Sequence, residues 1–175
     1  MLPLSFFPAI NLFEVLLSFA YRNIKTLNTM YTGLNHAHSG LRWIVLLLLI
    51  LAVGTAFRKL RSGHEFNDND RRMALFGLIG THLQLVIGLV LYFISPKVQF
   101  VAGVMADKVL RFYTVEHITV MLLAIVLITM GYSKAKRREK ADGKFKAIAT
   151  YYGIGLLLIL ISIPWPFRGL GAGWF

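Results

Sequence analysis

Four histidines lie in or beside long apolar stretches of the sequence, where ionisable side chains are rare. They are His36, His38, His82 and His117, while the fifth, His64, lies among charged residues and is predicted to be solvated. An ionisable residue at membrane depth is a candidate functional residue, because burying it in lipid costs free energy. The depth of each histidine along its helix therefore indicates which of them could act together.

Depth pairs His38 with His117. At about 1.5 Å of rise per residue, His38 lies about 28 Å above the end of its apolar stretch at Phe57, and His117 about 24 Å above the end of its own near Ser133. Two imidazoles at one level on two helices of a bundle suit the two axial positions of a b-type haem. We predict one haem b with His38 and His117 as iron ligands, and His36 as the substitute for His38.

Two arginines are the predicted partners of the haem propionates, because arginine binds carboxylates with a two-pronged hydrogen bond. Arg42 follows His38 by one turn, and Arg111 precedes His117. Glu116 has two open interpretations, either pairing with a basic residue such as Arg111 or handling protons.

One face of the second apolar stretch is rich in small and polar residues, namely Gly77, Thr81, Gln84, Gly88 and Tyr92. Such a face lets either a neighbouring helix or a flat macrocycle approach closely. For Gly77 and Gly88 the pattern favours helix packing. Gln84 and Gly88 are the candidate cofactor contacts. His82 lies beside this face, and we expect it to hydrogen-bond a neighbouring helix.

Composition places these residues in a membrane. The chain has 175 residues, of which 57% are hydrophobic and only 15% charged, too few for an ordinary soluble domain. Four apolar runs, at about 37–57, 73–94, 109–132 and 147–163, are long enough to cross a bilayer. The sequence predicts an all-α, integral membrane, four-helix up-down bundle. The absence of cysteine excludes disulfides, thiolate metal sites and covalently attached haem.

Charge indicates the orientation. The net charge of +11 comes mainly from "RKLRSGHEFNDNDRR" and "SKAKRREKADGKFK", the segments that follow the first and third runs. Basic loops stay in the cytoplasm, so both ends of the bundle core are predicted to lie on the outer side of a bacterial inner membrane. This distribution explains the positive charge without nucleic acid.

Residues 1–29 fit this pattern poorly, since Pro8, Asn11 and Glu14 interrupt their apolar run. They form either an amphipathic segment in the membrane interface or an extension upstream of a true start at Met30. The pattern favours Met30, which would make 30–175 the transmembrane domain.

The stretches "HAHSGLRW", "THLQLVIGLVLYF", "FYTVEHITVMLLAIVLITMGYSKAK" and "ISIPWPF" resemble a family of small bacterial four-helix membrane proteins catalogued as cytochrome-B-like. The resemblance covers about 30–175 and implies haem b and electron transfer. A weaker resemblance links the chain to one half of haem A synthase. The chain departs from that family because it has a single bundle and has Leu34 where the family has a glutamate one turn before the first histidine.

The prediction is a b-type cytochrome-like protein of a respiratory chain, an electron carrier rather than a stand-alone enzyme. It would pass electrons from a quinol or a partner subunit to an acceptor at the outer face. Two alternatives remain open: a haem-free accessory subunit of a larger membrane complex, and a haem-modifying or quinol-oxidising enzyme in which Glu116 and His82 handle protons. The expected partners are membrane lipid, a quinol, other subunits of a membrane complex or a second copy of the chain.

Overall fold

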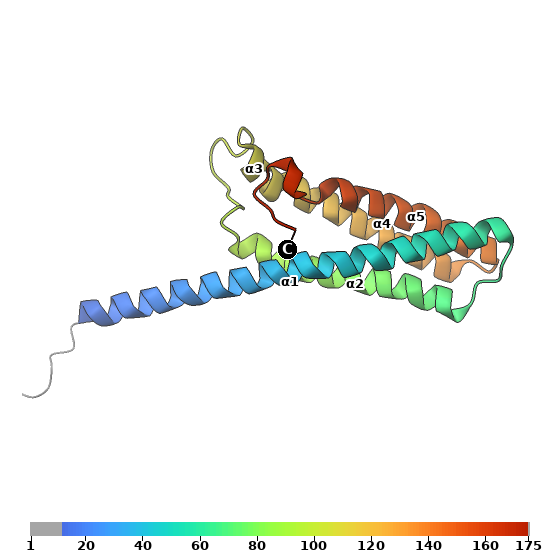
Figure 1. Cartoon of the computed structure of the whole chain (residues 1–175), viewed down its shortest axis with the longest axis horizontal. Helices are drawn as coiled ribbons and strands as arrows, with labels where there is room; N and C mark the ends of the chain where they lie inside the picture. Colours follow the sequence, from blue (N-terminus) through green and yellow to red (C-terminus); the bar gives the residue numbers. More distant parts are fainter. Residues whose placement is uncertain (1–11, 175) are drawn as a thin grey trace, which may run out of the picture.

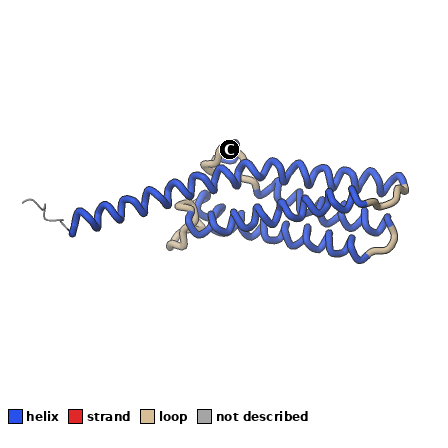
Figure 2. The backbone as a smooth tube through the Cα atoms, turned by 90° about the horizontal axis from the view of Figure 1, so that it is seen from below, coloured by secondary structure: helices blue, strands red, loops and turns tan. Residues whose placement is uncertain are grey.

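The computed structural model describes residues 12–174, and every element within that range is helical (Figures 1 and 2). The elements are α1 (Leu12–Ser62), α2 (Asp68–Ile94), α3 (Lys108–Arg111), the π-helical turn η2 (Phe112–Glu116), α4 (His117–Arg137), α5 (Ala141–Ser162) and the 3-10 turn η3 (Pro166–Arg168). α3, η2 and α4 follow one another without a break.

α1, α2, α4 and α5 pack as a bundle in which successive helices run in opposite directions (Figure 1). α1 packs along α2 and α5, α5 packs along α4, and α2 makes a smaller contact with α4. α1, α2, α5 and the helical stretch Lys108–Arg137 are each long and apolar enough to cross a membrane. The predicted four-helix all-α bundle is confirmed, and the chain is a multi-pass membrane protein.

α1 is much longer than the span predicted within it. Its 51 residues correspond to about 76 Å, against about 30 Å for the hydrocarbon core of a bilayer. Its N-terminal part projects beyond the rest of the bundle (Figure 1). Residues 12–29 continue the helix without interruption, because no glycine or proline falls between 12 and 32. Residues 1–11 of the predicted extension lie outside the described residues.

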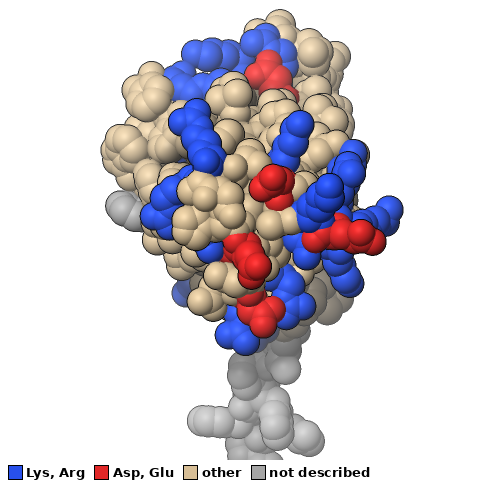
Figure 3. All heavy atoms as spheres, turned by 90° about the vertical axis from the view of Figure 1, so that its right-hand side faces the viewer, with Lys and Arg blue, Asp and Glu red and all other residues tan. Residues whose placement is uncertain are grey.

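The end of the bundle that carries the turns 63–67 and 138–140 is called the basic end. Lys and Arg side chains gather around it (Figure 3). α2 starts there because Asn67 and Asp70 form a reciprocal capping box, in which each side chain accepts from the other residue's backbone N–H. Lys59 Nζ donates to Asp70 Oδ2 at 2.8 Å, which joins α1 to α2. The placement of this end in the cytoplasm stays a prediction.

From the basic end to the middle of the bundle the helices are closely packed. A Cβ on Gly131 would lie 2.7 Å from the Cβ of Tyr151, so α4 and α5 approach closely only because this position is glycine. The Tyr152 ring is fully buried, and its hydroxyl donates to the Ala74 carbonyl of α2 at 2.8 Å. Gly77 faces Leu49 and Tyr152, which confirms its predicted packing role.

Candidate functional site

At the opposite end, called the cavity end, the helices leave a cavity of about 200 Å³. One water needs only about 10–15 Å³ by the same kind of measure, so this space is a binding-site candidate rather than a packing defect. α1, α2, η2, α4, the end of α5, the loop 95–107 and the C-terminal residues 171–173 all contribute to its lining. The apolar part of the lining consists of Val45, Leu46, Leu85, Leu91, Val98, Ile118, Met121, Ile125, Ile159 and Ile163.

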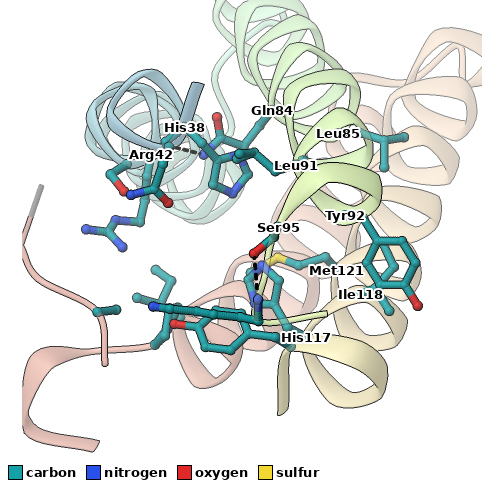
Figure 4. Close-up of a pocket in the computed structure, with 18 of the residues that line it drawn as sticks. His38, Arg42, Gln84, Leu85, Leu91, Tyr92, Ser95, His117, Ile118 and Met121 are labelled. Carbon is teal, nitrogen blue, oxygen red and sulfur yellow. Dashed lines mark hydrogen bonds between the residues drawn. The ribbon is translucent and has the colours of Figure 1, made fainter. Parts of the chain in front are cut away.

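His38 enters the cavity from α1 (Figure 4). Its ring lies against Gly88 of α2, where an added Cβ would be 3.1 Å from His38 Cε1. Gly88 therefore packs closely against α1, as favoured, and the side chain that it accommodates is the imidazole of His38. The Nδ1 atom of His38 is buried and has no hydrogen-bond partner within the described residues.

Gln84 sets the backbone position of His38. Its Nε2 donates to the His38 carbonyl at 2.6 Å, across the contact between α2 and α1. Its Oε1 is buried without a partner in the described part of the chain. Gln84 and Gly88, one turn apart on α2, thus support the same residue of α1.

His117 enters the cavity at the start of α4, and a backbone carbonyl orients its ring. The distance from His117 Nδ1 to the Ser162 carbonyl oxygen is 2.8 Å. A carbonyl only accepts, so Nδ1 carries the proton, and Nε2 keeps the lone pair in the neutral imidazole. A hydrogen bond of this kind fixes the tautomer and orientation of metal-binding histidines.

The Ser162 carbonyl is free for this role because α5 ends at that residue. In a continuing helix it would accept from the backbone N–H four residues later, but that residue is Pro166, which has none. The sequence "SIPWP" therefore predicts that the Ser162 carbonyl lacks a helical partner, but it does not predict that His117 binds this carbonyl.

A π-helical turn, η2, directly precedes His117. The His117 backbone N–H donates to the Phe112 carbonyl, five residues back. The carbonyl of Thr114 within this turn accepts from the Tyr92 hydroxyl of α2 at 2.8 Å. π-helical turns occur frequently at functional sites, and here one fixes the register with which His117 enters α4.

Two cations line the cavity near its mouth. Arg42 Nη2 donates to the Trp174 carbonyl at 2.8 Å, while Arg42 Nε is buried without a partner among residues 12–174. Lys97, in the loop after α2, donates to the Gly171 carbonyl, and its ammonium lies 4.8 Å from the centre of the Tyr113 ring. Partial burial lowers the pKa of Lys97.

Three buried side-chain polar atoms lack a hydrogen-bond partner in the described residues, and all three belong to this cavity: His38 Nδ1, Arg42 Nε and Gln84 Oε1. Buried polar groups in native proteins are nearly always paired, so each exception needs an explanation. A ligand in the cavity would explain their position together.

The structure brings five of the seven predicted site residues to the cavity, namely His38, Arg42, Gln84, Gly88 and His117. It does not bring His36 or Arg111 there. His36 is exposed on α1. Arg111 Nε pairs with Glu116 Oε1 at 2.7 Å, so the pairing interpretation of Glu116 is confirmed.

His82 and His64 also lie outside the cavity. His82 is exposed, and its Nδ1 lies 2.9 Å from the carbonyl of Leu78 on its own helix, so the predicted bond to a neighbouring helix is wrong. His64 is exposed, as predicted, with its Nδ1 2.6 Å from Ser62 Oγ.

Sequence analysis missed Lys97, Tyr113 and the C-terminal residues 171–173. Their contribution depends on how the loop 95–107 and the tail fold back over the helix ends, and helix periodicity carries no information on that. The tail is anchored by Tyr113, whose hydroxyl donates to the Leu170 carbonyl at 3.1 Å.

The protein ligands that the cavity offers to a metal or cofactor are its two histidines. No group of three or more His, Cys, Asp or Glu side chains that could hold a metal occurs within the described residues. A structural zinc site takes four such ligands, whereas a haem iron needs only one or two from the protein. The two cavity histidines and the apolar lining are of the kinds that a haem site uses.

Fold and cavity together define a four-helix multi-pass membrane protein with an apolar, histidine-containing pocket between its helices. Comparison with family models, curated proteins and solved structures gives no match. The resemblance to cytochrome-B-like proteins and to haem A synthase therefore stays a prediction, and the function has to be argued from the site.

Proposed function

We propose that the protein is a membrane-bound, b-type cytochrome-like electron carrier that holds one haem b between His38 and His117. The observation that carries the proposal is the pairing of two histidines across one cavity (Figure 4). One has its Nδ1 held by the Ser162 carbonyl, and the other has a buried Nδ1 without a partner. The hydrogen bond to His117 Nδ1 leaves Nε2 available for metal binding. The buried Nδ1 of His38 costs free energy unless a ligand or another group gives it a partner.

Other contacts support the same proposal. Gln84 fixes the backbone of His38, and the absence of a side chain at Gly88 leaves space for the imidazole. The apolar lining would exclude water from the pocket and favour a flat hydrophobic macrocycle. Bound haem would supply one-electron chemistry, while the protein would set its potential through the two imidazoles and through burial.

The direction of electron transfer rests on charge. The basic end is the predicted cytoplasmic side, which puts the cavity at the outer side of the membrane. In this proposal a quinol or a partner subunit donates the electron within the membrane, and an acceptor takes it at the outer face. In this proposal the haem lies close enough to the outer face for an electron to leave the bilayer.

The test is haem retention in histidine variants of the full-length protein purified in detergent. His38→Ala and His117→Ala should each lose the six-coordinate haem spectrum, while His36→Ala and His82→Ala, which change exposed histidines, should keep it. Circular dichroism checks that the four variants remain equally helical. Loss of haem from His36→Ala but not from His38→Ala would contradict the proposal.

A second candidate function is a haem-free accessory subunit. The N-terminal part of α1 favours it, because this segment extends beyond the bundle and exposes large apolar side chains such as Leu16, Phe19 and Ile24. An exposed apolar surface of this kind is typical of interaction sites. This candidate predicts that the wild-type protein stays free of haem even when haemin is added.

The enzyme alternative gains no support from the geometry. Its proton-handling candidates were Glu116 and His82, and neither is among the residues that line the cavity. Glu116 pairs with Arg111, and His82 points outward on α2.

A further inference from the structure

The two cations at the mouth of the cavity, Arg42 and Lys97, form no salt bridge within residues 12–174. The salt bridges within residues 12–174 join Lys59 to Asp70, Arg71 to Asp68 and Arg111 to Glu116. Neither Arg42 nor Lys97 has a carboxylate partner among these residues. A partly buried cation is stabilised by an anion or by hydrogen-bond acceptors, so the acceptors of these two cations indicate what a ligand could replace.

Backbone carbonyls take the place of an anion at both cations. Arg42 donates to the Trp174 carbonyl, and Lys97 donates to the Gly171 carbonyl. Both acceptors belong to residues 169–174, which are called the strap. Since the two carbonyls are three residues apart, they lie at most about 11 Å from one another. The two cations therefore face a short segment that a single ligand edge could span.

The strap lies against the cavity, and its residues that line the cavity have small side chains or none. Gly171, Ala172 and Gly173 line the cavity. Gly169 and Gly171 have φ angles of 66° and 65°, a conformation that favours glycine and lets the chain turn back over the mouth. Trp174 stacks on Trp43, with ring centres 6.2 Å apart, which fixes the far end of the strap.

We propose that Arg42 and Lys97 form a subsite for the two carboxylates on one edge of the ligand, and that these carboxylates displace the strap carbonyls of Trp174 and Gly171. The inference rests on the proposed function, in which the carboxylates are the haem propionates. It replaces Arg111 by Lys97 as the second cation, because Arg111 is already paired with Glu116. A carboxylate makes a stronger, charge-assisted hydrogen bond with these cations than a backbone carbonyl does.

The first test compares haemin with haemin dimethyl ester, in which both carboxylates are esterified. Optical titration of the full-length protein should show a preference for haemin of at least about tenfold, the usual effect of losing one hydrogen bond to a charged group. Lys97→Met and Arg42→Gln should each weaken haemin binding by about tenfold and weaken ester binding clearly less. Arg111→Gln, the control at the same end of the bundle, should bind both ligands as the wild type does.

The outcomes separate the subsite from the proposed function. If the wild type binds both ligands equally, or if the Lys97 and Arg42 variants weaken both equally, the subsite is wrong while the haem site stands. If the folded wild type binds neither ligand, the proposed function fails, and the subsite fails with it.

The second test measures displacement of the strap. Because the chain contains no cysteine, Ala172→Cys introduces a single thiol in the strap. Haemin should raise the rate at which a maleimide labels this thiol, and the dimethyl ester should not. An unchanged labelling rate with saturating haemin would overturn the displacement of the strap.

Discussion

At the basic end of the bundle a glycine brings two helices together, whereas at the cavity end a glycine makes room for a side chain. A Cβ on Gly131 of α4 would lie 2.7 Å from the Cβ of Tyr151, an atom fixed to the backbone of α5. A Cβ on Gly88 of α2 would instead lie 3.1 Å from the imidazole of His38. The same residue type therefore joins two helix backbones at the basic end and accommodates the imidazole of His38 at the cavity end.

The two ends also differ in how they treat buried polar groups. At the basic end the Tyr152 hydroxyl has an acceptor, and Lys59 and Asp70 pair with each other. At the cavity end three buried polar atoms have no partner within the described residues. A fully satisfied polar network supports a fixed structure, whereas unsatisfied buried groups call for a partner such as a bound water or ligand. The basic end therefore stabilises the fold, and the cavity end carries the candidate site.

Overpacking the helix contact at the basic end should have the largest effect on stability. Gly131→Val would place its Cβ against a backbone-fixed atom of α5, so α4 and α5 must separate. We expect a loss of about 2–3 kcal/mol in the free energy of unfolding. Thermal unfolding followed by circular dichroism in detergent measures it. Gly54→Val, at an exposed position with no atom within 4 Å of an added Cβ, is the control. An unchanged midpoint for Gly131→Val would mean that the contact is not needed.

A larger side chain beside His38 at the cavity end should abolish ligand binding at a smaller cost in stability. Gly88→Leu would occupy the space of the His38 ring, so we expect haem binding to be lost while the unfolding midpoint changes less than in Gly131→Val. Gly54→Leu is again the control for a larger side chain on a helix surface. If Gly88→Leu kept full haem binding, the space beside His38 would not be part of the site.

Removing one hydrogen bond at the basic end should have the smallest effect on stability. Tyr152→Phe deletes the bond to the Ala74 carbonyl, and we expect a loss of about 1 kcal/mol in the free energy of unfolding. Haem affinity should not change, because Tyr152 does not line the cavity. Tyr151→Phe, on the neighbouring residue, is the matched control for a lost hydroxyl. A fall in haem affinity with Tyr152→Phe would show that the two ends are coupled.

Much of this arrangement follows from local properties of the sequence. The four apolar runs predicted the helices, and the rise per residue predicted that His38 and His117 would lie at one level. Both histidines line the same cavity, as that prediction requires. Gly77 could be assigned to packing, since small residues on one face commonly join membrane helices.

What the sequence could not predict depends on chain segments that fold back from the helices. Arg111 and Lys97 both lie near the cavity end, and only the path of the loop 95–107 decides that Lys97 lines the cavity. The π-helical turn before His117 shifts the register of the helix, which periodicity assumes to be constant. His82 bonds to its own helix because it faces outward, away from the helix that would have offered a partner.

The central proposal is that the cavity end of the bundle holds a haem between two histidines. A reduced-minus-oxidised absorption spectrum of the full-length protein in detergent, before and after addition of haemin, tests it most directly. The account predicts the sharp α and Soret bands of a six-coordinate b haem. A flat spectrum from well-folded protein, unchanged by haemin, would contradict it.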